Sequence, residues 1–153
     1  MKKVLVLGIG NRLMMDDGIG IYVIEELSKR TCRANIQYVI GESDIDYCLE
    51  HIEGATLVII IDAVYSGTAP GELTIYPLAN VLEHQTLHIS PHNLHLFQVL
   101  YLQKDTIKGF LIGVEPSEIK YHIGLSQFIQ QRWKEILASV NSTIEKIVVN
   151  EIR

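Results

Sequence analysis

The sequence predicts an α/β protein with a mostly parallel sheet and helices on both of its faces. Short apolar runs alternate along the chain with segments of helical periodicity, which is the pattern of strand–helix–strand units. The clearest run, residues 57–61, is rich in β-branched residues and carries no charge before Asp62, as expected for a buried strand. No linker, repeat or low-complexity segment interrupts the alternation, so we expect a single domain over residues 1–153.

The first half of the chain supplies three of the expected strands. Residues 4–7 are wholly apolar and end at Gly8, which is typical of a short buried strand. Between 19 and 27 apolar residues recur at helical spacing, and Lys29 and Arg30 suit the negative end of the helix dipole. In chain order we expect a strand at 4–7, a helix at 19–27, a strand at 36–40, a short helix at 46–52 and a strand at 57–61.

The second half begins with a turn-rich stretch at 66–71 and continues the alternation. Ser90 and Pro91 are residue types that favour the cap and the first turn of a helix, so we expect a helix to begin there. The expected elements are a strand at 73–76, a short helix at 78–84, a helix at 90–102, a strand at 110–114 and a long helix at 126–150 with a break near 141–143.

Composition narrows the functional classes. The formal net charge of −5 and the pI of about 5.6 argue against a nucleic-acid partner, because such binding relies on clustered Lys and Arg. The apolar run near the N-terminus is too short for a signal peptide, and no run approaches the length of a membrane span. Cys32 and Cys48 form no CxxC motif and indicate free thiols, so we expect a cytoplasmic protein without a membrane partner.

A glycine-rich turn with two acids follows the first expected strand. Gly8 and Gly10 match part of a dinucleotide-binding fingerprint, but Leu13 stands where that fingerprint needs a third glycine. A tight strand-to-loop turn explains the two glycines equally well. Asp16 and Asp17 come just before the first helix, where carboxylates commonly cap the N-terminus. We expect one of them to cap the helix and the other to point into a cleft.

Asp62 and His92 also lie at the boundaries of expected strands and helices. Asp62 ends an apolar strand, where an ionised carboxylate is costly unless it is paired or binds a metal. His92 lies in the first turn of an expected helix, whose positive potential favours the neutral imidazole that binds metals. A capped turn and a surface histidine are the simpler interpretations of these two residues. Because ligands of α/β sheets bind at the carboxyl ends of strands, we expect one of the two acids of the glycine-rich turn to form a divalent transition-metal site together with Asp62 and His92.

A covalent nucleophile has little support in the sequence. No GxSxG elbow is present. Cys48 lies within an expected helix without an obvious positive partner, which indicates an inert thiol. The chemistry is therefore expected to rest on the two carboxylates and the imidazole.

Four blocks of sequence are distinctive when taken together. They read Gly-Ile-Gly-Asn-Arg-Leu-Met-Met-Asp-Asp-Gly-Ile-Gly at 8–20, Ile-Asp-Ala at 61–63, Ser-Pro-His-Asn-Leu at 90–94, and Gly-Val-Glu-Pro at 113–116 followed by His-Ile-Gly-Leu at 122–125. In order and spacing they resemble the [NiFe]-hydrogenase maturation endopeptidases over nearly the whole chain. The resemblance implies a three-layer α/β/α sandwich around a twisted, mostly parallel sheet of the phosphorylase/hydrolase-like type.

The same resemblance implies an activity. Members of that family are aspartyl-type endopeptidases that remove the C-terminal peptide of a precursor hydrogenase large subunit after nickel insertion. The metal-binding and catalytic positions fall on Asp17, where the family often has Glu, and on Asp62 and His92. Asp16 matches a preceding family acid. Nickel is expected to arrive with the substrate, and other divalent transition metals are expected to fit the same donors.

One segment departs from the family pattern. Where the family typically has Asp-Gly-Gly-Thr after the second strand, this chain has Ile-Gly-Glu-Ser, and the resemblance associates Gly41, Glu42 and Ser43 with substrate selection. We expect Glu42 to border the cleft and to favour a basic residue in the partner. Two other functions stay open at this point: a nucleotide-binding oxidoreductase that uses the glycine turn, and a non-catalytic nickel-binding chaperone on the same scaffold.

Overall fold

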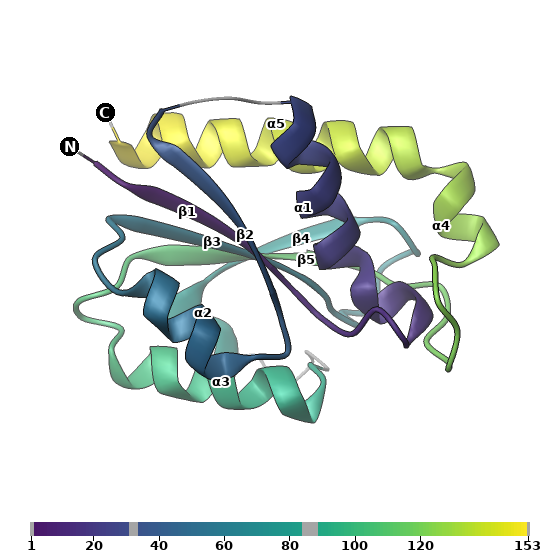
Figure 1. Cartoon of the computed structure of the whole chain (residues 1–153), viewed down its shortest axis with the longest axis horizontal. Coiled ribbons are helices and arrows are strands. Elements are labelled where there is room, and N and C mark those ends of the chain that lie inside the picture. Colours follow the sequence, from purple (N-terminus) through teal and green to yellow (C-terminus); the bar gives the residue numbers. More distant parts are fainter. Residues whose placement is uncertain (1, 31–33, 84–88, 153) are drawn as a thin grey trace.

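The computed structural model describes residues 2–30, 34–83 and 89–152, with the backbone but not the side chain of His92. Its centre is a five-stranded sheet of order β2-β1-β3-β5-β4, in which β4 alone runs antiparallel (Figure 1). The strands are β1 (Val4–Ile9), β2 (Ile36–Glu42), β3 (Leu57–Ala63), β4 (Leu73–Pro77) and β5 (Gly109–Val114). The expected mostly parallel sheet is confirmed.

Helices cover both faces of the sheet and produce three layers. In Figure 1, α1 and α5 lie on one side of the strands and α2 and α3 on the other. Two separate apolar clusters, one on each face, fill the space between the layers. The helices are α1 (Ile19–Arg30), α2 (Ile45–Ile52), α3 (Pro91–Leu102), α4 (Gln127–Gln131) and α5 (Trp133–Ile152), with 3-10 turns η1 (Met15–Gly18) and η2 (Leu78–Glu83).

The central strand β3 shows why the apolar runs become strands. All seven of its residues are buried. Alternate side chains of a strand point to opposite faces, so Ile59 and Ile61 enter the cluster under α1 and α5, whereas Val58 and Ile60 enter the cluster under α2 and α3. Each such side chain contributes roughly 1.5–3 kcal/mol through burial. The two-sided core therefore holds this strand, and Asp62 at its end, in a fixed position.

The C-terminal helical region differs from the expectation. The predicted break near 141–143 is wrong, because α5 runs unbroken through these polar residues and Thr143 Oγ1 donates to Ser139 O at 2.7 Å. The interruption lies instead at Arg132, which ends α4 with φ −103° and ψ 10°. Apolar residues of α5 continue at helical spacing on both sides of Thr143 and pack on the sheet, so tertiary burial outweighs the weak helix propensity of the polar residues.

Some sequence expectations reach beyond the described ranges. The short helix expected at 78–84 is the 3-10 turn η2, and its last residue, His84, lies outside the described residues, as does Cys32.

Cys48 is a buried free thiol, and burial together with the charge of Asp44 raises its pKa to about 11, in keeping with an inert side chain. Within the described ranges, no helix has the length and apolar character needed to span a membrane.

Candidate active site

Three glycines let the first loop and helix approach the sheet closely. A side chain on Gly20 would overlap the carbonyl oxygen of Ile61, and one on Gly8 would overlap that of Gly20. Gly10 has φ 141°, and the carbonyl oxygen of Asp17 occupies the space next to its Cα. These close contacts bring η1 and the start of α1 directly onto the end of β3. The glycine turn thus serves close backbone packing.

Asp62 is fully buried at the carboxyl end of β3. Its Oδ1 accepts from Ala63 N at 2.8 Å and its Oδ2 accepts from Asn93 Nδ2 at 3.0 Å. Burial raises the pKa of Asp62 well above its usual range, and the negative charge of Asp17 raises it further, while the two hydrogen bonds act in the opposite direction. A carboxylate with two donors and a like charge nearby is electrostatically unfavourable, which makes it a strong ligand for a cation or a proton.

Asp17 supplies the second carboxylate of this pair. It is 9 % exposed and lies in η1, where its Oδ2 accepts from Asn11 N at 3.0 Å. The turn η1 packs on β3, so the two carboxylates lie in one region, and the negative charge of Asp17 raises the pKa of Asp62. Oxygen donors of like charge in a buried place fit a divalent ion, because the ion offsets the repulsion between them.

The first turn of α3 meets the same strand end. Ser90 caps the helix, since its Oγ accepts from Asn93 N at 3.4 Å, and His92 is the second residue of the helix. The neighbouring Asn93 is the residue that donates to Asp62. The side chain of His92 lies outside the described part, so its role as third donor stays a prediction. Among the described side chains, no group of three or more His, Cys, Asp and Glu is arranged to hold an ion.

Asp16 has a role that the sequence did not indicate. Asp16 is not the acid of the pair that caps the helix, because its fully buried carboxylate accepts from the segment 117–126. Its Oδ2 accepts from Ser117 N and Glu118 N at 2.9 Å and from Ser126 Oγ at 2.7 Å, and its Oδ1 accepts from Ser126 N at 2.7 Å. Four donors satisfy this carboxylate and tie two distant loops together.

Glu115 likewise accepts several hydrogen bonds and holds the loop that follows Asp62 in place. It is 5 % exposed, and its Oε1 accepts from Ser66 N at 2.9 Å, Ser66 Oγ at 3.0 Å and Thr68 Oγ1 at 3.1 Å. Burial and the negative charges of Asp16, Glu115 and Asp17 raise the pKa of Tyr65 in this loop. The block at 113–116 therefore positions the loop beside the carboxylate pair.

The segment expected to select the substrate packs against the first loop. Glu42 has φ 51°, a left-handed conformation that favours glycine, and its carbonyl oxygen accepts from Gly10 N at 3.0 Å. Its exposed carboxylate pairs with Arg12 Nε at 3.2 Å. Ser43 Oγ donates to Gly10 O at 3.2 Å. Glu42 and Ser43 thus lie beside the turn that carries Asp17, although Glu42 already has a cationic partner.

Gly41 has a packing role. It is buried, and a side chain there would overlap Cys48 Sγ on α2. The register between β1 and β2 shifts at this point, so that Ile9 lies opposite Glu42 rather than Gly41. A bulge of this kind redirects the end of a strand. Contact of Gly41 with a substrate stays a prediction.

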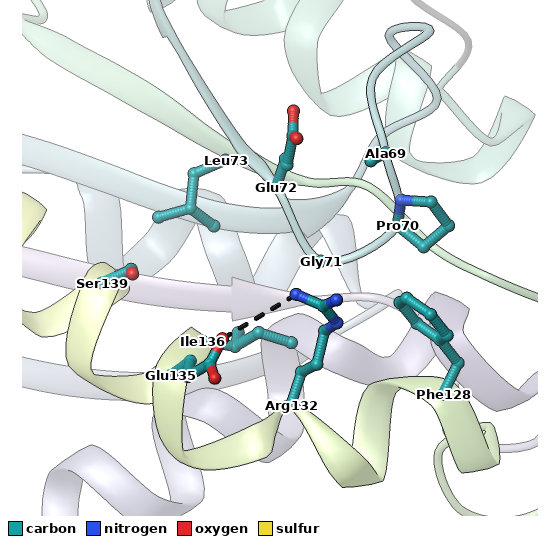
Figure 2. A pocket seen from close by; sticks show the side chains of 10 residues that line it. All are labelled: Ala69, Pro70, Gly71, Glu72, Leu73, Phe128, Arg132, Glu135, Ile136 and Ser139. Atoms are coloured by element: carbon teal, nitrogen blue, oxygen red, sulfur yellow. Dashed lines mark ion pairs between the residues drawn. The ribbon is translucent and has the colours of Figure 1, made fainter.

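A separate groove lies between the segment 69–73 and helices α4 and α5 (Figure 2). Its volume is about 590 Å³, and neither acid of the buried pair lines it. Arg132 lies across it, above the ring of Phe128 at 5.0 Å and 3.8 Å from Glu135 Oε2. Side chains of both charge signs line the groove, so it does not single out one ligand. The carboxylate pair is the stronger candidate for chemistry.

Comparisons with known proteins identify the family of the chain. The model of a hydrogenase maturation protease family matches residues 21–143. The chain is 31 % identical to the hydrogenase 2 maturation protease of Escherichia coli, over 98 % of this chain and 95 % of that protein. A putative hydrogenase maturation protease of Methanocaldococcus jannaschii is 27 % identical over 99 % and 97 % of the two chains.

Solved structures show the same fold. The hydrogenase maturating endopeptidase HybD of Escherichia coli superposes with a TM-score of 0.79 at 29 % identity, over 94 % of this chain and 93 % of that one. The resemblance seen in the four sequence blocks and the expected three-layer fold are thereby confirmed. The chain belongs to the hydrogenase maturation protease family and is an endopeptidase of that family.

Proposed function

We propose that this protein removes the C-terminal peptide of a precursor [NiFe]-hydrogenase large subunit once nickel has been inserted. The observation that carries the proposal is the pair of buried carboxylates, Asp17 and Asp62, at the carboxyl edge of the sheet. Membership of the maturation protease family supports the reaction class. Nickel is treated as part of the substrate that the enzyme receives.

The chemistry of the donors fits such a substrate. Two carboxylates that repel each other in a buried region favour binding of a divalent cation, and His92 is the proposed third donor. A substrate without the metal leaves the repulsion between Asp17 and Asp62 in place and so binds less well. This difference gives the enzyme a means of acting only on precursor that has been loaded with nickel.

The chain itself holds its donors in position. Asn93 and the Ala63 N–H fix both oxygens of Asp62, and the Asn11 N–H fixes one oxygen of Asp17. Ordered donors lower the cost of placing a substrate against them. A divalent metal in such a site polarises a carbonyl or lowers the pKa of a bound water. We assign Asp17, Asp62 and His92 to the reception of the metal-bearing segment next to the bond to be cleaved.

The proposal is tested by cleavage of a purified precursor. Nickel-loaded and nickel-free large subunit are incubated with the wild type and with Asp62→Asn, and released peptide is identified by mass spectrometry. We expect cleavage near the C-terminus for the loaded precursor with the wild type alone. Binding of the loaded precursor without cleavage would overturn the proposal in favour of a nickel-binding chaperone.

A further inference from the structure

Exposed apolar side chains gather at the end of the molecule that carries the carboxylate pair. Ten large apolar residues are exposed in the described ranges, and seven of them lie on loops or helix starts at the carboxyl edge of the sheet. One is Tyr47 at the start of α2, and the other six are Leu13, Tyr65, Leu94, Tyr121, Ile123 and Phe128. Soluble proteins seldom leave apolar side chains concentrated in one region unless that region binds a partner.

Three of the six form what we call the apolar rim: Leu13, Tyr121 and Ile123. Their exposed fractions are 43 %, 80 % and 71 %. They come from two loops far apart in the sequence, the turn after β1 and the segment between β5 and α4, which lie side by side in Figure 1. The exposure of Tyr121 and Ile123 is thus a feature of a defined junction between loops.

Hydrogen bonds hold the rim in place. His122 N donates to Leu13 O at 2.8 Å, and Met15 N donates to His122 O at 2.9 Å. The four bonds of Asp16 secure both ends of the segment that carries Tyr121 and Ile123. A surface ordered before binding loses less conformational entropy when a partner covers it.

The rim is continuous with the candidate active site. Leu13 N donates to Asn11 Oδ1 at 2.9 Å, Asn11 N donates to Asp17 Oδ2 at 3.0 Å, and Asp17 N donates to Met14 O at 3.1 Å. One hydrogen-bonded loop therefore carries both Leu13 and Asp17. A folded protein that binds the rim would therefore lie close to Asp17.

We propose that the apolar rim is the docking surface for the folded body of the precursor, and that its partner is an apolar patch bordering the segment to be cleaved. This inference rests on the proposed function. The charged residues next to the rim already have partners: Lys120 pairs with Glu118 at 3.7 Å, and Arg12 pairs with Glu25 and Glu42 at 3.0 and 3.2 Å. An apolar partner surface therefore matches the rim better than a strongly charged one does.

The test uses the full-length double variant Tyr121→Ser/Ile123→Ser, with Leu102→Ser as the matched control. Leu102 is 84 % exposed but ends α3 on the opposite, amino-end side of the sheet. We expect the rim variant to raise KM for nickel-loaded precursor about tenfold or more with little change in kcat, as loss of two apolar interface anchors should. The control should behave as the wild type does. A KM equal to that of the control would overturn the inference.

Two further measurements distinguish docking of the precursor on the rim from a failure of the proposed activity and from self-association of this chain. Binding of the loaded precursor by isothermal titration calorimetry tests the rim even if no cleavage occurs, so a failure of the proposed activity and a failure of the rim can be distinguished. Sedimentation equilibrium tests whether the rim instead joins two copies of this chain. A wild-type dimer that the rim variant converts to monomer would overturn the inference, and wild type and variant with the same mass would support it.

Discussion

Two groups of buried acids in this molecule have opposite surroundings. Among the described residues, Asp16 and Glu115 accept four and three hydrogen bonds and hold loops together, whereas Asp62 accepts two and lies near the like charge of Asp17. Burial of a charge is tolerated when donors compensate it and is unfavourable when they do not. The hydrogen bonds of Asp16 and Glu115 thus identify acids that stabilise the fold, whereas the surroundings of Asp62 favour a bound cation or proton.

Replacement of Asp62 by Asn should give the largest functional effect. We expect cleavage of the loaded precursor to fall about a thousandfold or more, the scale on which loss of a charge-stabilising group acts. The melting temperature of the metal-free protein should rise, because the variant removes an unfavourable buried charge and Asn93 can reorient its amide to keep a hydrogen bond. A clear loss of stability at neutral pH would contradict this assignment.

The higher stability of Asp62→Asn relative to the wild type should depend on pH. Because the pKa of Asp62 is raised in the folded state, its contribution favours folding most at low pH, and stability declines as pH rises through the unfolded value near 3.8 towards the folded value. The difference between Asp62→Asn and the wild type should therefore shrink as pH is lowered towards 3.8. Thermal unfolding in the presence of a chelator, at a series of pH values, measures this trend.

Replacement of His92 by Ala should abolish processing with little effect on folding. The predicted role is metal ligation from a helix start, and changes outside packing positions usually alter stability by only about 0.5 kcal/mol. The measurement compares the melting temperature with the cleavage of loaded precursor. Full processing by the variant would refute the ligand role, and a collapsed melting temperature would show a structural role instead.

Replacement of Asp by Asn, which should stabilise the folded protein at position 62, should destabilise it at position 16. In Asp16→Asn the amide group places a donor against backbone N–H groups of the segment 115–126, so buried donors lose their acceptor. We expect a loss of about 3 kcal/mol, from one or two unsatisfied groups, measured by urea unfolding. A loss below about 1 kcal/mol would show that this carboxylate is not a tether.

Glu42→Gly should have the smallest effect on stability. Glycine removes the cost of the left-handed conformation at φ 51°, about 1 kcal/mol, and loses an exposed ion pair with Arg12 that contributes about 0.2–1 kcal/mol. We also expect the ratio of cleavage rates for a cognate and a non-cognate precursor to change, and this change to shrink at high salt. Equal ratios for the two proteins would leave Glu42 with a purely local role.

The sequence by itself determined the layered fold and the places where chemistry could lie. The buried run of β3, the helical spacing of α1 and the Ser90–Pro91 start of α3 are local patterns, and local patterns report secondary structure because they depend on neighbours a few residues away. Asp62 and the pair Asp16 and Asp17 stood out for the same reason. Asp62 ends an apolar strand, and the pair comes just before the first helix.

Only the tertiary structure decided what each acid does. The partners of Asp16 lie 101–110 residues further along the chain, and the partner of Asp62 on α3 lies 31 residues away. The pairing of Arg12 with Glu42 and the break of the C-terminal helix at Arg132 likewise depend on contacts between distant segments. Hydrogen-bond satisfaction and burial are properties of the folded path of the chain, so adjacent, identical residues such as Asp16 and Asp17 can be told apart only once that path is known.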